Sequence, residues 1–90
     1  MLESVSGMDV VVIGTTTGNR TNAFVNVDEV LRVPPNIRLS NQVPLPYGTD
    51  ATGDRMLYAY SLTEPKAFSL YDLDQLPEVE KLFREYLIGN

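Results

Sequence analysis

The fold class of this chain follows from residues 76–88, LPEVEKLFREYLI. Apolar residues recur there at i, i+3, i+4, i+7 and i+8, the spacing that places side chains on one face of an α-helix. Burying five such side chains contributes about 8–15 kcal/mol before entropy is counted, so this helix is expected to dock on a sheet or on a partner. The predicted apolar stripe consists of Val79, Leu82, Phe83, Tyr86 and Leu87.

The residues around this stripe also favour a helix. Pro77 is tolerated in the first helical turn, and Asp72 or Asp74 is placed to cap the start. On the polar face, Glu80 and Arg84 are spaced at i, i+4, where opposite charges stabilise a helix. We therefore predict a C-terminal amphipathic helix.

The N-terminal part of the chain predicts a β-hairpin. Residues 9–13 are one aspartate followed by β-branched side chains, which is typical of a strand buried on both faces, and this strand is expected to end at Gly14. Residues 14–22 are rich in glycine, threonine and asparagine and predict a long polar tip before a second strand over 23–27. Residues 28–33 fit either a short helical turn or continued strand, and both remain open.

A second hairpin is predicted closer to the C-terminus. Alternation over residues 56–62 places Tyr58, Tyr60 and Leu62 on one face of a strand. Residues 67–71 alternate in the same way after a turn that contains proline, and they predict the paired strand.

The segment between the two hairpins, residues 34–54, is rich in proline and glycine. Residues 37–39 are expected to form a brief edge strand, and residues 40–54 a long connection. Connections of this length are uncommon in a compact domain and usually carry a function or contact a partner.

Together these elements predict one domain over residues 1–90, with residues 1–7 as a loose tail. The predicted fold class is α+β, a small antiparallel sheet of three to five strands covered on one face by the C-terminal amphipathic helix. The uncovered face or a sheet edge is then available to a second copy of the chain. We therefore expect a homo-oligomer, with a dimer favoured.

Composition narrows the chemistry that the chain can carry. It has no cysteine and no histidine, which excludes disulfides and removes the commonest ligands of transition metals. The N-terminus does not resemble a signal peptide and no stretch is long and apolar enough to cross a membrane, so we expect a cytoplasmic protein without membrane contact. Seven basic residues are spread along the chain against twelve acidic ones, and the net charge of −5 disfavours nucleic-acid binding.

Two local patterns partly resemble cofactor or metal-binding motifs, but each lacks a feature that such a motif requires. Residues 10–18, VVVIGTTTG, run from a predicted strand into a glycine loop, but the spacing fits no phosphate-binding motif and the next residues predict strand instead of helix. Asp72 and Asp74 could supply oxygen ligands to Mg²⁺ or Ca²⁺, yet Phe83 stands where a calcium loop needs glutamate. We predict no cofactor and no metal, and we assign these acids to the start of the helix.

The tyrosines provide the best candidate site. Tyr47, Tyr58 and Tyr60 are the predicted interaction residues, because tyrosine combines a large contact area with a hydrogen-bonding hydroxyl. Packing of these rings into the core is the alternative. The leading hypothesis is a non-enzymatic interaction domain that self-associates and binds a protein partner through the tyrosines and residues 34–54.

Two other functions remain open on sequence alone. The first is small-ligand binding or catalysis in a pocket shared between subunits, which would use aspartate, glutamate, tyrosine and arginine side chains, although no spacing singles out a catalytic residue. The second is an acidic inhibitor that blocks a basic site on another protein. Such an inhibitor would bind with a steep dependence on salt concentration.

Overall fold

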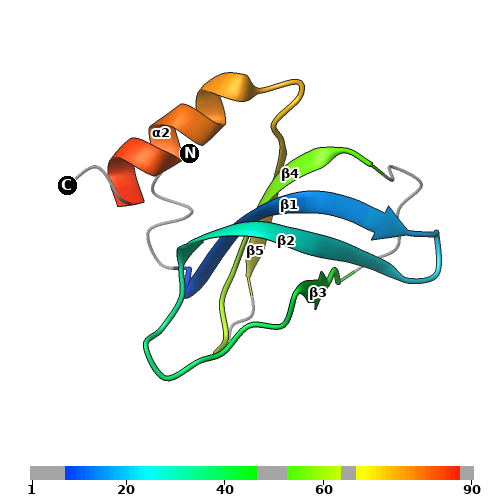
Figure 1. The fold of residues 1–90 in the computed structure, drawn as a ribbon, viewed down its shortest axis with the longest axis horizontal. Helices are drawn as coiled ribbons and strands as arrows, with labels where there is room; N and C mark the ends of the chain where they lie inside the picture. Colours follow the sequence, from blue (N-terminus) through cyan, green and yellow to red (C-terminus); the bar gives the residue numbers. More distant parts are fainter. Residues whose placement is uncertain (1–7, 47–52, 64–66, 88–90) are drawn as a thin grey trace.

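The computed structural model describes residues 8–46, 53–63 and 67–87 (Figure 1). Its elements in chain order are β1 (Val10–Gly18), β2 (Ala23–Arg32), β3 (Gln42–Pro44), β4 (Arg55–Tyr60), β5 (Phe68–Asp72) and α2 (Pro77–Leu87). The strands form one sheet in the order β3-β2-β1-β4-β5, and every neighbouring pair is antiparallel. The predicted α+β class is therefore confirmed, with both predicted hairpins present and one C-terminal helix.

The central strand β1 is buried on both faces, as its β-branched composition predicts. Its side chains alternate between two apolar clusters on opposite faces of the sheet. The helix-side cluster consists of Met8, Val11, Ile13, Leu31, Leu57, Ala59, Leu73, Val79 and Phe83. The concave-side cluster consists of Val10, Val12, Ala23, Val25, Val43, Leu45 and Tyr58.

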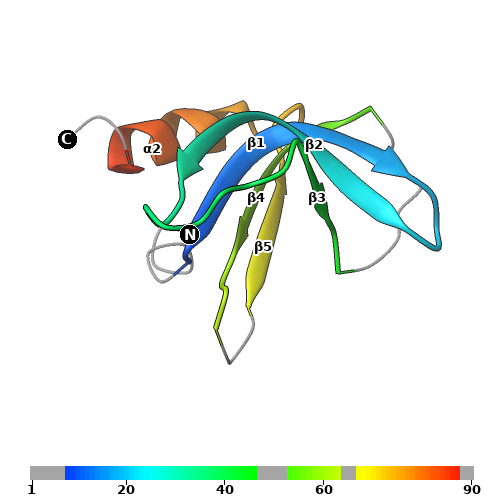
Figure 2. The same cartoon turned by 60° about the horizontal axis from the view of Figure 1, so that its bottom comes forward.

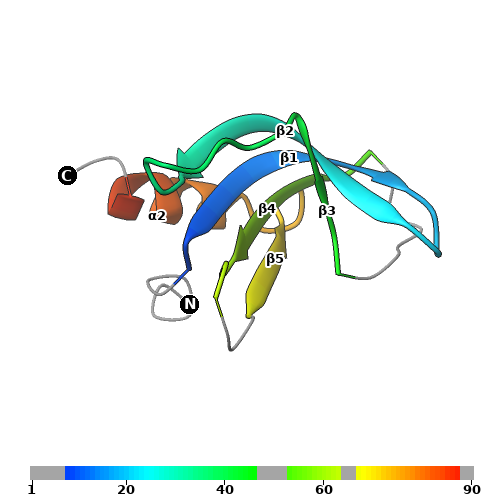
Figure 3. The same cartoon turned by 90° about the horizontal axis from the view of Figure 1, so that it is seen from below.

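The sheet is curved, so that its two ends, β3 and β5, lie on the same side of the β1–β2 hairpin (Figures 2 and 3). The concave-side cluster fills the inside of this curve, because it takes Val43 from β3 and packs against Leu70 from β5. Helix α2 lies on the opposite face, over the helix-side cluster. The concave side is thus the face that the helix leaves uncovered.

The first hairpin is longer than the sequence predicts. Strand β1 does not end at Gly14 but continues to Gly18, and the turn is reduced to residues 19–22. Gly14 is required by close approach of the neighbouring strand: a Cβ atom there would lie 2.1 Å from the Asn26 carbonyl oxygen. The glycine therefore permits the strand to pass close to β2 instead of ending it.

Strand β2 settles the open interpretation of residues 28–33 in favour of strand, which extends to Arg32. Its pairing with β1 is irregular at two places, where Asp28 and Leu31 have no opposite residue. Because side chains alternate with period two, an extra residue moves those that follow it to the other face. Val25 accordingly belongs to the concave-side cluster and Leu31 to the helix-side cluster.

The predicted edge strand over residues 37–39 is wrong. These residues follow a turn in which the Ile37 N–H donates to the Pro34 carbonyl oxygen at 3.1 Å, and the edge position is taken by β3 instead. Val43 pairs opposite Val25 and brings an apolar side chain to the concave side. Pairing with β2 therefore occurs at β3, where Val43 can be buried, and this strand lies inside residues 40–54, the segment predicted to be a long connection.

The helix docks with only part of its predicted stripe. Val79 and Phe83 are fully buried, whereas Leu82 and Tyr86 are each 41% exposed. Val79 and Phe83 belong to the helix-side cluster and Leu87 packs against it, so the helix contacts the sheet through this side of the stripe. The expectation that all five side chains are buried is thus corrected, and two of them face outward.

Candidate functional site

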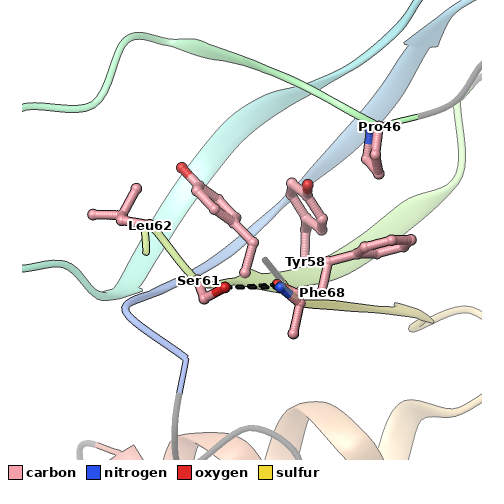
Figure 4. A pocket seen from close by; sticks show the side chains of 7 residues that line it. Pro46, Tyr58, Ser61, Leu62 and Phe68 are labelled. Carbon is pink, nitrogen blue, oxygen red and sulfur yellow. Dashed lines mark hydrogen bonds between the residues drawn. The ribbon is translucent and has the colours of Figure 1, made fainter. Parts of the chain in front are cut away.

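An apolar groove opens on the concave side of the sheet, at the end of the β4–β5 hairpin (Figure 4). It has a volume of about 250 Å³ and combines three segments: the end of β4, the start of β5 and the residues after β3. We call it the aromatic groove. Its described lining residues are Pro46, Tyr58, Tyr60, Ser61, Leu62, Ala67 and Phe68.

Three aromatic rings form the floor and rim of the aromatic groove. Tyr58 and Tyr60 are stacked, with ring centroids 4.9 Å apart, and Phe68 meets Tyr58 edge-on at 6.4 Å. Tyr58 is only 5% exposed and belongs to the core, whereas Phe68 is 44% exposed. The floor is therefore fixed by packing, and the rim presents apolar surface to the outside.

Backbone bonds hold the rim in place. The Ser61 hydroxyl accepts a bond from the Ala67 N–H at 2.8 Å, and the Ser61 N–H donates to the Ala67 carbonyl at 2.9 Å. The Leu62 N–H donates to Asp9 Oδ2 at 2.7 Å, which anchors a side chain that is 40% exposed. The groove is thus built on a hairpin whose two strands are bonded to each other and to Asp9, the residue before β1.

The lining chemistry is almost entirely apolar and neutral. Among the lining residues that the structure describes, none carries a charge at neutral pH. Burial raises the pKa of Tyr60, so that its hydroxyl stays protonated under physiological conditions. Such a site can bury apolar groups and exchange a few hydrogen bonds, but it has little capacity for proton transfer.

The structure brings together two of the three tyrosines predicted from the sequence. Tyr58 and Tyr60 both line the aromatic groove, on the face that alternation predicts, while Tyr47 lies outside the described residues. The sequence analysis missed Phe68, whereas Pro46 falls within residues 34–54, the segment predicted to contact a partner. Alternation places Phe68 on one face of its strand, but only the β4–β5 register, in which it pairs with Tyr60, shows that it joins the site.

A second polar cluster, the ion-pair network, lies on the helix side. Arg55 of β4 donates from Nη2 to Glu80 Oε2 at 3.0 Å, and Arg84 Nε donates to the same oxygen at 2.9 Å. Arg84 also binds Glu29 of β2. The pKa of Glu80 is lowered to about 2, chiefly by the bond from Arg55, so the carboxylate stays charged and paired. These residues fasten the helix and provide no carboxyl group suited to acid–base catalysis.

Neither Asp72 nor Asp74 caps the helix as predicted, because both carboxylates accept bonds from backbone N–H groups outside α2. Asp72 Oδ1 accepts bonds from the backbone N–H groups of Asp74 and Gln75 at 2.9 and 3.3 Å, and Asp74 Oδ2 accepts from the Arg55 N–H at 3.3 Å. These bonds shape the turn that leads into Pro77, the first residue of α2. Within the described ranges, no three aspartate or glutamate side chains gather in a way that could hold a metal ion.

The glycine-containing stretch 10–18 is a strand and leads through a four-residue turn into β2, so it does not end at a helix N-terminus as phosphate-binding loops do.

Comparison with protein-family models, curated proteins and solved structures found no match for this chain. In the part of the chain that the structure describes, no helix is long and apolar enough to span a membrane.

Proposed function

We propose that this protein is a non-enzymatic protein-interaction domain whose partner inserts a bulky apolar side chain into the aromatic groove. One observation carries the proposal: three apolar or aromatic side chains, Tyr60, Leu62 and Phe68, surround an open groove and are held by a fastened hairpin. Exposed apolar surface with a polar surround marks interaction sites on small proteins.

The size of the groove favours an anchoring side chain over a free ligand. Drug-sized ligands occupy pockets of about 300–1,000 Å³, and the aromatic groove falls below this range at about 250 Å³. Full burial of one leucine or phenylalanine side chain stabilises a complex by about 1.5–3 kcal/mol. The remaining affinity must then come from contacts outside the groove, as a protein partner provides.

Catalysis receives less support. The Ser61 hydroxyl is engaged with Ala67, and the raised pKa of Tyr60 keeps its hydroxyl protonated, so that it is not available to accept a proton. Small-ligand binding in the aromatic groove remains the second candidate. A protein partner is favoured over nucleic acid because the chain carries a net charge of −5, and we retain the cytoplasm as the expected compartment.

We also propose that the protein self-associates through the outward side of α2. Leu82 and Tyr86 lie one helical turn apart and are each 41% exposed. This apolar patch includes no residue of the aromatic groove. A dimer formed there would leave the groove open to a different protein.

Peptide display tests the groove. The full-length protein is immobilised and panned with a random peptide library, and recovered peptides are measured by fluorescence anisotropy. We expect them to share a bulky apolar residue and to bind Phe68→Ala and Leu62→Ser at least about tenfold more weakly than the wild type. The control variant, Leu82→Ala, changes an equally exposed leucine on α2 and should bind as the wild type does.

Two results would contradict the groove assignment. One is peptides that bind Phe68→Ala as tightly as the wild type. The other is a library that yields no binder at all. A thermal-shift screen of small molecules separates the second candidate, since a saturating stabilisation by a compound, lost in Phe68→Ala, indicates a ligand pocket.

A further inference from the structure

The two edges of the sheet are protected to different degrees. Strand β3 has three residues, includes Pro44 and is soon followed by Pro46. Natural proteins use short strands, prolines and charges to keep a sheet edge from pairing with another chain. Strand β5 has five residues, and its first four, FSLY, include neither proline nor a charged side chain. Of these two edge strands, β5 is therefore the better suited to accept another strand.

The unprotected edge is continuous with the aromatic groove. Strand β5 stands at the end of the sheet order, with β4 on one side and no further strand on the other among the described residues. Its first residue, Phe68, lines the groove, and all five of its residues are exposed or half-buried. A segment that paired with β5 would lie directly beside the groove opening.

Alternation fixes which side chains of that segment would enter. Phe68 lines the groove and Leu70 packs against the concave-side cluster, while Tyr71 packs against the helix-side cluster. Side chains of paired strands point to the same face when they stand opposite each other. Every second residue of an added strand would therefore face the groove and the concave side, so apolar residues are needed there at i, i+2 spacing.

Charge limits the kind of partner. Asp72 ends β5 and is the one charged side chain of that strand. The first four residues of β5 carry no charge, and the chain as a whole is acidic. From Phe68 to Asp72 the strand spans about 13 Å, so a basic residue at the end of an apolar core would meet the Asp72 carboxylate.

We propose that the partner binds by strand addition, as an extended segment that pairs with the open edge of β5, inserts an apolar side chain into the aromatic groove and carries flanking lysine or arginine. This inference rests on the proposed function and specifies its binding mode. A second copy of this chain fits the edge less well. Antiparallel pairing of two β5 strands about Leu70 would set Phe68 of one copy opposite Asp72 of the other.

The test uses the full-length protein and a labelled synthetic peptide, Lys-Val-Thr-Leu-Thr-Val-Lys, that has the required alternation and charge. Two N-methylated forms remove the backbone N–H groups of either the odd or the even residues. In strand addition only one set of N–H groups pairs with the sheet edge. We expect one form to bind at least about tenfold more weakly than the parent peptide and the other to bind within about twofold of it.

Two further measurements sharpen this test. Amide exchange of β5 should slow when the parent peptide is bound, as seen by nuclear magnetic resonance. Asp72→Asn should weaken binding by about threefold, because it removes a charge while its side-chain oxygen can still accept the turn bonds from Asp74 and Gln75.

The outcomes separate the two proposals. If both N-methylated forms bind as the parent does and Phe68→Ala still abolishes binding, strand addition is wrong and the groove assignment stands. Strand addition is also wrong if the designed peptide does not bind while display recovers groove-dependent peptides of a different pattern. The groove assignment stands in that case. If the protein without peptide protects β5 and doubles its mass with rising concentration, a second copy occupies the edge and the proposed partner class is wrong.

Discussion

Arg84 of helix α2 donates from Nη2 to Glu29 Oε1 of strand β2 at 2.6 Å, which joins two residues that are 55 positions apart in the sequence. The same guanidinium binds Glu80, which in turn binds Arg55 of β4. The network therefore links the helix to two strands on either side of β1. It supplements a hydrophobic contact in which only Val79 and Phe83 of the helix are fully buried.

The ion-pair network makes the free energy of unfolding depend on pH in the acid range. The pKa of Glu80 is lowered from an ordinary 4.5 to about 2 by its bonds with Arg55 and Arg84. Because the folded-state pKa is the lower one, the stabilisation is present above about pH 4.5 and is lost as the pH falls toward 2. We expect Glu80→Gln to lower the free energy of unfolding at pH 7 by about 1–2 kcal/mol and to flatten the loss of stability below pH 4.5.

Urea denaturation at several pH values measures both effects. The exposed Glu85 of the same helix provides the control, since Glu85→Gln should leave the acid-dependent loss as steep as in the wild type. A Glu80→Gln protein whose stability fell between pH 4.5 and 2 as steeply as that of the wild type would contradict the assigned role of the network.

Gly14 is predicted to be one of the least replaceable residues. Gly14→Ala places a Cβ 2.1 Å from the Asn26 carbonyl oxygen and 2.6 Å from Val25 Cγ1, so two strands must move apart. We expect a loss of about 2–4 kcal/mol in the free energy of unfolding, above the usual cost of overpacking. Gly53→Ala is the matched comparison, since its Cβ meets nothing within 4 Å and only the positive φ of 89° is unfavourable.

Gly14→Ala is expected to lower the free energy of unfolding more than Gly53→Ala does. Gly53→Ala should cost about 1 kcal/mol, the ordinary penalty of a left-handed conformation for alanine. Thermal unfolding of the two variants measures which one is less stable. If Gly14 were merely the end of a strand, as the sequence alone suggests, Gly53→Ala would be the less stable variant.

The helix offers a second matched pair. Phe83 is fully buried in the helix-side cluster and meets Tyr71 edge-on at 5.5 Å, whereas Leu82 beside it is 41% exposed. We expect Phe83→Ala to lower the free energy of unfolding by about 3–5 kcal/mol and Leu82→Ala by less than about 1 kcal/mol. Equal losses in dilute protein would mean that the helix docks through a different face.

Local sequence patterns were sufficient to predict the hairpins and the helix, but not to predict where the first strand ends. The alternation of Tyr58 and Tyr60 and the helical period of Val79 and Phe83 depend only on neighbouring residues, and the structure confirms both. Gly14 was misinterpreted because its role depends on the approach of Asn26, which no short window contains. Non-local packing decides whether a glycine ends a strand or lets it pass.

The same limit applies to the stripe and to the site. A helical period shows which side chains share a face, but only the packing of α2 on the helix-side cluster shows that Leu82 and Tyr86 stay outside. Alternation predicts that Tyr60 and Leu62 lie together. Pro46 reaches the aromatic groove only because the sheet curves, and that curvature follows from strand pairing across the whole chain.

Self-association gives the last prediction. The outward residues Leu82 and Tyr86 should form the contact between copies, because they place two large apolar side chains one turn apart on an exposed helix face. We expect light scattering during size-exclusion chromatography to show a dimer whose population rises over about a hundredfold range of protein concentration. Leu82→Glu combined with Tyr86→Glu should give a monomer that remains folded. The control, Leu62→Glu in the aromatic groove, should still dimerise. A wild-type protein that stays monomeric throughout would remove self-association from the proposed function and leave partner binding by the groove as the single role of the domain.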